Sequence, residues 1–170
     1  MSKAKAQREA KRIWTEIGKP VPVPIEEIFA QYGIELQRKE LEPSVSGMMV
    51  TRENSKVVVA VNKNDPANRQ RFTMAHELGH YLLHRSTNPI FVDGRTFFRD
   101  EKSSSGTRIQ EIEANAFAGE LLMPEEAVRS RVSEKLSIMD GFELGELASN
   151  FKVSEAAMSI CLSRLDLLEE

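Results

Sequence analysis

The sequence predicts an α+β fold in which a small antiparallel or mixed β-sheet packs on helices. Apolar residues recur with helical spacing in the first part of the chain and again in its second half. Between them, over residues 34–62, short apolar segments have the pattern of strands. A chain of 170 residues with 41% hydrophobic residues is long enough to bury a core. We therefore expect a main domain over residues 1–124 and a smaller helical subdomain over residues 125–170.

Two helices are predicted before the sheet. The first is amphipathic and ends near Gly18. Its apolar positions are Ala6, Ala10, Ile13, Trp14 and Ile17. The proline-rich residues 20–24 then impose an extended connector, because proline fixes φ and lacks an amide donor. Residues 25–32 form a second, short helix, which Gly33 ends.

Three strands are predicted next. Residues 34–37 alternate between apolar and polar side chains. Residues 46–51 and 56–62 form two more strands, joined by a turn at residues 53–55. The three consecutive valines at positions 57–59 indicate that the last of these strands is buried on both faces.

Two longer helices follow the strands. The first covers about residues 66–84, because Asp65 can cap it and proline is favoured at the first helical position. Turn-forming residues then indicate a long loop over residues 86–107, with one short strand around residues 96–99. The second long helix covers about residues 108–123, and the proline that follows ends it and begins another helix.

The lengths of the apolar runs, the charge distribution and the cysteine content each argue against a class of function. No apolar run reaches the length of a signal-peptide core or a membrane span, so we expect a cytoplasmic protein with no membrane association. Residues 125–170 carry five basic and ten acidic side chains, a local net charge of −5, which argues against direct DNA binding. Cys161 is the only cysteine, so any metal site must use nitrogen and oxygen ligands.

The segment His76-Glu77-Leu78-Gly79-His80 points most directly to a chemical activity. On a helix, His76 and His80 lie about 40° apart around the axis and one turn apart along it, so both imidazoles can bind one metal ion. This spacing is typical of zinc peptidases, in which the glutamate after the first histidine is the general base. A histidine pair on a solvated helix face is the alternative. Gly79 falls on the apolar side of the helix, where it permits close approach of a neighbouring element.

A catalytic zinc ion usually has three protein ligands, so the third must come from another segment. His84 lies about 6 Å further along the helix axis than His80, away from the ion. We expect it to interact with the helix C-terminus or with substrate. The second long helix offers Glu111 and Glu113. Glu113 shares a stripe with apolar residues, where a carboxylate is costly to bury unless it is paired or binds a metal. This periodicity favours Glu113 only modestly over Glu111.

Four segments resemble the ImmA/IrrE family of metallopeptidases. They are RFTMAHELGHYLLH at residues 71–84, EIEANAFAGELLMP at residues 111–124, Tyr32-Gly33-Ile34 and Ser46-Gly47-Met48. The resemblance extends over roughly residues 25–124. It implies a small zincin-like domain of the gluzincin type, in which the active-site helix and a second metal-binding helix pack with the sheet.

The same resemblance implies a set of site residues. The zinc ligands of the family correspond to His76, His80 and Glu113, and its general base corresponds to Glu77. This correspondence selects Glu113 over Glu111. Affinity trends favour Zn²⁺ at such a site, although nitrogen and oxygen ligands also accept Mn²⁺ or Fe²⁺.

The function that the resemblance implies is that of a zinc-dependent metalloendopeptidase acting on a partner protein. Many members of the family cleave or inactivate a small helix-turn-helix repressor of the Xre type encoded at the same locus, which links stress signals to transcription. Others belong to toxin–antitoxin pairs. The alternative is therefore a non-proteolytic binding partner or toxin–antitoxin component that keeps the zinc site for structure. The chain resembles a short form of the family, without the sensor-like domain of longer relatives.

The end of the chain, residues 143–168, resembles a helix-turn-helix in which Ser154 caps the second helix. The start of that helix, residues 154–157, offers no arginine, lysine or asparagine to DNA bases. A structural or protein-docking role is therefore favoured over DNA binding. We also expect an extended substrate to add to an exposed edge of the hairpin at residues 46–62.

Overall fold

The computed structural model describes residues 3–52, 56–84, 90–94, 104–133, 135–137 and 141–169. Its helices and strands confirm the α+β class. In chain order they are α1 (Lys3–Glu16), α2 (Ile25–Gln31), β1 (Glu35–Lys39), β2 (Val45–Thr51), β3 (Val57–Asn62), α3 (Ala67–His84), β4 (Ile90–Gly94), α4 (Ser104–Leu122), α5 (Glu125–Arg129), β5 (Leu136–Ser137), α6 (Gly141–Phe151), α7 (Glu155–Arg164) and β6 (Leu168–Glu169).

The main sheet has four strands in the order β1-β3-β2-β4. Strand β1 pairs parallel to β3, whereas β2 pairs antiparallel to both β3 and β4, so the sheet is mixed. All six residues of β3 are buried, as the run of valines predicted. This strand is therefore enclosed on both faces, and the active-site helix α3 packs against β2 and β3.

The strand order contradicts one expectation about substrate binding. The hairpin at residues 46–62 comprises β2 and β3, and each of these strands is paired on both sides. Neither offers an exposed edge for a substrate, so that expectation is wrong. The edges of the sheet are β1 and β4. Strand β4 was not anticipated at residues 90–94, and the strand predicted around residues 96–99 lies outside the described residues.

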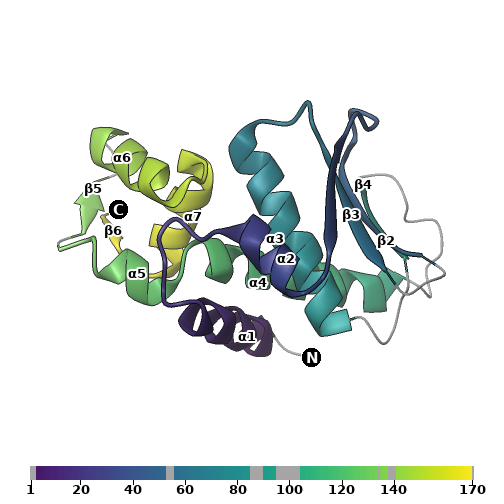
Figure 1. The fold of residues 1–170 in the computed structure, drawn as a ribbon. Helices are drawn as coiled ribbons and strands as arrows, with labels where there is room; N and C mark the ends of the chain where they lie inside the picture. Colours follow the sequence, from purple (N-terminus) through teal and green to yellow (C-terminus); the bar gives the residue numbers. More distant parts are fainter. Residues whose placement is uncertain are drawn as a thin grey trace.

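Helix α3 lies between the sheet and the C-terminal helices, and α4 passes across it (Figure 1). The contact between these helices is close because Gly79 has no side chain. A Cβ atom built on Gly79 would lie 3.2 Å from the Cα atom of Ala114 and 3.1 Å from the ring of Phe117. The close approach expected at Gly79 is confirmed, and it brings the polar residues of α4 to the histidine pair.

Helix α1 covers α4 on the side away from α3 (Figure 1). Its predicted apolar face is confirmed, since Ala6, Ala10, Ile13 and Trp14 are all buried. Beyond the end of the helix, Gly18 has a φ of +88°, a conformation that glycine adopts at little cost. Helix α1 thereby packs against α4 on the side opposite α3.

The C-terminal helices α5, α6 and α7 gather around the end of α4 (Figure 1). Ser154 caps α7 as predicted, its hydroxyl accepting a hydrogen bond from the Ala157 amide at 3.2 Å. The parallel strands β5 and β6, which we did not predict, pair the segment before α6 with the segment after α7. None of the helices in the described part of the chain combines the length and apolar character of a membrane span.

Candidate metal centre

Helix α3 presents two imidazoles to one point in space. His76 and His80 are both buried, and their Nε2 atoms lie 3.0 Å apart. The helical repeat accounts for this convergence, because residues four apart lie on the same face of a helix. Leu78 and Ala75, on the opposite side of α3, are buried in the core and fix the orientation of the helix.

Glu111 of α4 supplies a carboxylate to the same point. Its Oε2 atom lies 3.3 Å from Nε2 of His76, and its Oε1 atom lies 3.0 Å from Nε2 of His80. For zinc–ligand bonds of about 2.0–2.2 Å, neighbouring donor atoms of a tetrahedral site are about 3.3 Å apart. The three donors are thus at separations that suit one small metal ion.

Asn115 lies one turn after Glu111 and holds the first histidine in place. Its Oδ1 atom is 3.0 Å from Nδ1 of His76. An amide oxygen can only accept, so Nδ1 carries the proton and Nε2 keeps its lone pair for a metal. Our sequence reasoning missed this role. The i, i+4 spacing of Glu111 and Asn115, the same as that of the histidines, was the available signal.

The structure does not bring Glu113, the residue selected from the sequence, to the histidine pair. Its Oε2 atom lies 3.5 Å from Nε2 of His84, and both residues are buried. Glu113 is about 200° around the helix axis from Glu111, so the two carboxylates serve different faces of α4. The structure thus brings Glu111, and not Glu113, within reach of both histidines. His84 is buried beside Glu113 and does not line the cleft described below.

The pKa shifts suit a metal cation bound by the Glu111 carboxylate and a neutral imidazole at His84. Burial tends to raise the pKa of Glu111, but the close imidazoles of His76 and His80 outweigh burial and hold the pKa well below its usual range. Burial lowers the pKa of His84, and the neighbouring His80 lowers it further. Glu111 is therefore ionised at neutral pH, as a metal ligand must be.

Glu77 is fully buried and faces the sheet at Gly47. A Cβ atom on Gly47 would lie 3.7 Å from Oε1 of Glu77, only 2.4 Å from Cγ2 of Thr73 and 3.1 Å from the carbonyl oxygen of Ala60. Only glycine lets β2 approach α3 so closely. This contact gives a physical reason for the glycine in the segment Ser46-Gly47-Met48.

A cleft of about 700 Å³ is lined by two residues of this cluster, His76 and Glu111. Its walls come from β2, from α3 with the residues just before it, from α4, and from the start of α7 with the residue pair before it. The lining residues are Ser46, Pro66, Asn68, Arg69, Phe72, Thr73, His76, Glu111, Asn115, Met123, Val153, Ser154 and Ala157. The start of α7 and the two residues before it therefore form one wall of the candidate site, which sequence reasoning did not anticipate.

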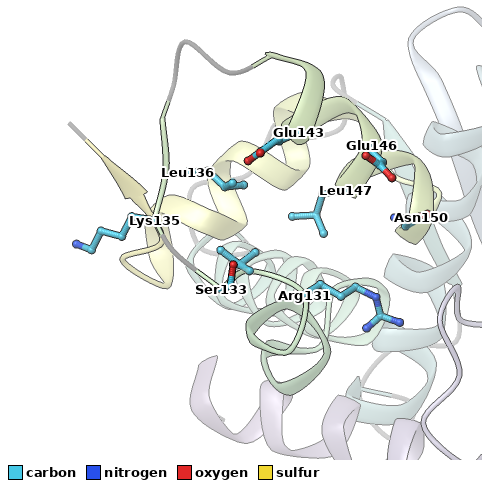
Figure 2. Close-up of a pocket in the computed structure, with 9 residues that line it drawn as sticks. Arg131, Ser133, Lys135, Leu136, Glu143, Glu146, Leu147 and Asn150 are labelled. Carbon is cyan, nitrogen blue, oxygen red and sulfur yellow. The ribbon is translucent and has the colours of Figure 1, made fainter.

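A second cavity, of about 510 Å³, lies among residues 131–150 (Figure 2). Figure 2 shows Leu136 and Leu147 toward its middle, with Glu143 and Glu146 on α6 along one side. Its charges are balanced between two acidic and two basic residues, and it contains none of the metal-ligating side chains. The cleft at His76 is therefore the candidate active site.

Several known proteins are similar to this chain. An uncharacterized immunity region protein 2 of Bacillus phage phi105 is 32% identical over 100 residues, which cover 59% of this chain and 58% of the relative. Metallopeptidase ImmA of Bacillus subtilis strain 168 is 29% identical over 105 residues, 62% of this chain and 56% of the relative. The matched region thus spans less than two thirds of either relative.

A solved structure, described as a Mycobacterium tuberculosis transcriptional regulator, shares the fold with a TM-score of 0.61. The match covers 94% of this chain and 46% of that one, at 20% sequence identity. The family of the IrrE N-terminal-like domain, Peptidase M78, matches residues 29–163. This match includes α3, α4 and most of α7, and it confirms the ImmA/IrrE resemblance: the chain belongs to this family of metallopeptidases.

Proposed function

We propose that this chain is a zinc-dependent endopeptidase that hydrolyses a peptide bond in a protein substrate. The observation that carries the proposal is the convergence of three donor atoms, from His76, His80 and Glu111, at separations of 3.0–3.3 Å. The buried Glu77 follows the first ligand on the same helix. The cleft lined by His76 and Glu111 has room for several residues of an extended peptide.

The chemistry follows from the roles of these residues. Zinc bound by His76, His80 and Glu111 would polarise the scissile carbonyl and lower the pKa of a bound water to about 7. Glu77 accepts a proton from the attacking water and delivers it to the departing amine. Asn115 keeps the imidazole of His76 in the tautomer that presents Nε2.

We also propose the finer description of the architecture. Two histidines of one helix and a glutamate of a second helix are the ligand arrangement of a gluzincin-type zincin-like domain, over residues 1–124. The remaining residues 125–170 would form a helix-turn-helix-like subdomain. Support for it comes from α6 and α7, which are separated by three residues and pack against each other. We keep the cytoplasm as the proposed location.

The proposed substrate is a small helix-turn-helix repressor of the Xre type from the same locus. The family and the immunity-region name of the phage relative support this choice. Because α7 contributes a wall of the cleft, we assign the C-terminal subdomain to docking of this protein rather than of DNA. Cleavage of the repressor would then relieve transcriptional repression. The rival reading is a non-proteolytic or toxin–antitoxin partner that keeps the metal for structure.

The test compares wild type with Glu77→Gln, which preserves volume and removes the base. We expect equal zinc content by elemental analysis and a loss of peptide hydrolysis of about 10²–10⁴-fold. The assays use a proteome-derived peptide library and the repressor of the same locus, with and without chelator. Glu40→Gln, at an exposed carboxylate of the loop after β1, is the matched control. Full hydrolysis by the Glu77 variant, or repressor inactivation that needs neither cleavage nor metal, would reject the proposal.

A further inference from the structure

Arg69 lies on the same face of α3 as the proposed zinc ligands. It precedes His76 by seven positions, which is nearly two full helical turns, so the two side chains point within about 20° of each other around the axis. Their separation along the axis is about 10.5 Å. Both residues line the candidate active-site cleft.

The guanidinium of Arg69 is held by one of its edges. Its Nε and Nη2 atoms donate to the hydroxyl of Ser46 at 2.9 and 2.8 Å. Asp65, one turn earlier, lies 3.3 Å from the same Nε. Ser46 itself is buried on β2, so the anchor is rigid. These contacts use the edge of the guanidinium that carries Nε. The opposite edge, formed by Nη1 and the second hydrogen of Nη2, can bind a ligand.

The chemistry of the cleft selects the kind of ligand. Of the described residues that line it, Arg69 is the one with a permanent positive charge, and its side chain is 52% exposed. A guanidinium presents two parallel N–H groups that match the two oxygens of a carboxylate. The carboxylate of Glu111 is committed to the metal-ligating cluster. An acidic group entering the cleft would therefore be directed to Arg69.

We propose that Arg69, positioned by Ser46, forms a subsite that binds an acidic side chain of the protein substrate. An extended peptide advances about 3.3 Å per residue, so the 10.5 Å along α3 correspond to about three residues. The acidic residue thus lies about three residues to one side of the scissile bond. This subsite rests on the proposed peptidase function, and it adds a substrate class to it: segments with a carboxylate at a fixed distance from the cleaved bond.

The first experiment digests a proteome-derived peptide library with the zinc-loaded protein and reads the cleaved sequences by mass spectrometry. Wild type should favour Asp or Glu at one position two to four residues from the bond, by about tenfold in kcat/KM over Lys. Arg69→Glu should reverse this preference, and Arg69→Gln should abolish it. Ser46→Ala should weaken it with little change at other positions. Melting temperatures verify that each variant is folded.

Arg129→Glu is the matched control. Arg129 also forms an i, i+4 ion pair, with Glu125 at 2.7 Å, and its side chain is 47% exposed, but it does not line the cleft. Its replacement should leave the cleavage preferences unchanged. Cleavage by wild type without an acidic preference, or the same preference in Arg69→Glu, would overturn the subsite while leaving the peptidase function intact.

A second experiment tests the subsite without hydrolysis. Random 12-residue peptides displayed on phage are selected on the zinc-loaded Glu77→Gln protein, with and without Arg69→Glu. We expect enrichment of Asp and Glu on the first protein and of Lys and Arg on the second. If wild type cleaves neither a library peptide nor the repressor, the peptidase function fails, and this selection alone decides about Arg69. Identical enrichment on both proteins would reject the subsite.

Discussion

The two faces of α4 carry the same chemical group in two different settings. Glu111 has a side chain that is 33% exposed, at the mouth of a cleft, with two imidazole nitrogens 3.0 and 3.3 Å away. Glu113, two residues later, is 2% exposed and lies beside His84 in the interior. The apolar stripe of α4 favoured Glu113 modestly and the family resemblance selected it, but the structure brings Glu111 to the histidine pair. A catalytic metal must be reached by substrate, so its ligands are found where donor atoms converge at an accessible surface.

Removing each carboxylate in turn is the strongest way to break this comparison. We expect Glu111→Gln to weaken zinc binding by more than the roughly 10–100-fold that loss of an outer partner costs, because a direct ligand is lost. Glu113→Gln, its matched control on the same helix, should retain stoichiometric zinc. Equilibrium dialysis with elemental analysis gives both values. Loss of zinc from the Glu113 variant alone would return Glu113 to the ligand set.

Much of the fold could be predicted because the relevant signals are local. Helix α1 follows from its apolar repeat, the buried strand β3 from consecutive valines, and the start of α7 from its capping Ser154. The short pair β5–β6 depends on two segments about 30 residues apart, and two residues in each strand carry no periodic pattern. The position of β4 is likewise set by its pairing with β2.

The candidate site likewise has a part that local sequence predicts and a part that depends on tertiary contacts. His76, Glu77 and His80 are close in sequence, so a helical wheel is sufficient to place them together. The third ligand depends on where α4 crosses α3, and a wheel drawn for α4 alone contains no information on that contact. It separated Glu111 from Glu113 correctly but could not say which of them faces the cleft. The assignment needed the contact at Gly79, which is a tertiary feature.

Enlarging Gly79 tests whether that contact holds the Glu111 face in place. In Gly79→Ala the new Cβ would meet the Cα and carbonyl oxygen of Ala114 at 3.2 and 3.3 Å, so α4 must shift. We expect a loss of about 1–3 kcal/mol in the free energy of unfolding, together with weaker zinc binding. Urea denaturation of the metal-free protein and a zinc titration measure the two effects separately.

Gly119 provides the control for this change, because it lies on α4 and, beyond its own helical turns, no atom of the described residues lies within 4 Å of a built Cβ. Gly119→Ala should stabilise the protein by up to about 1 kcal/mol through helix propensity and leave zinc binding unchanged. If both alanine variants behaved alike, close packing of α3 against α4 would not be what positions Glu111.

Replacing Asn115 tests whether its hydrogen bond to His76, on the same face of α4 as Glu111, contributes to zinc binding. Asn115→Ala removes the acceptor for Nδ1 of His76 and should weaken zinc binding by about 10–100-fold. Asn115→Asp keeps an acceptor of the same length and should retain most of the affinity. Competition with a chelator of known affinity measures both. Equal affinity in the alanine variant and wild type would show that the hydrogen bond does not orient the ligand.

A third carboxylate, Glu120, extends the comparison to the far end of α4, where the partner is a cation. Burial raises the pKa of Glu120, whereas the backbone amide of Glu125 at 3.1 Å and Arg164 at 3.3 Å oppose the rise. Because its folded-state pKa lies above the unfolded value, the native state binds more protons between these two values. The contribution of Glu120 to stability therefore falls as pH rises from about 4.5 through the raised pKa.

Glu120→Gln removes this titration and keeps an oxygen for one of the two donors, since Glu125 donates to Oε1 and Arg164 to Oε2. We expect the unfolding free energy of wild type, relative to the variant, to fall as pH rises from about 4.5 toward neutrality. The fall should be about 1.4 kcal/mol for each unit by which the pKa is raised. Urea denaturation of the metal-free proteins between about pH 4.5 and 7.5 gives the difference directly. A difference that grows in favour of wild type as pH rises would mean that Arg164 outweighs burial and that Glu120, like Glu111, is held ionised by its partner.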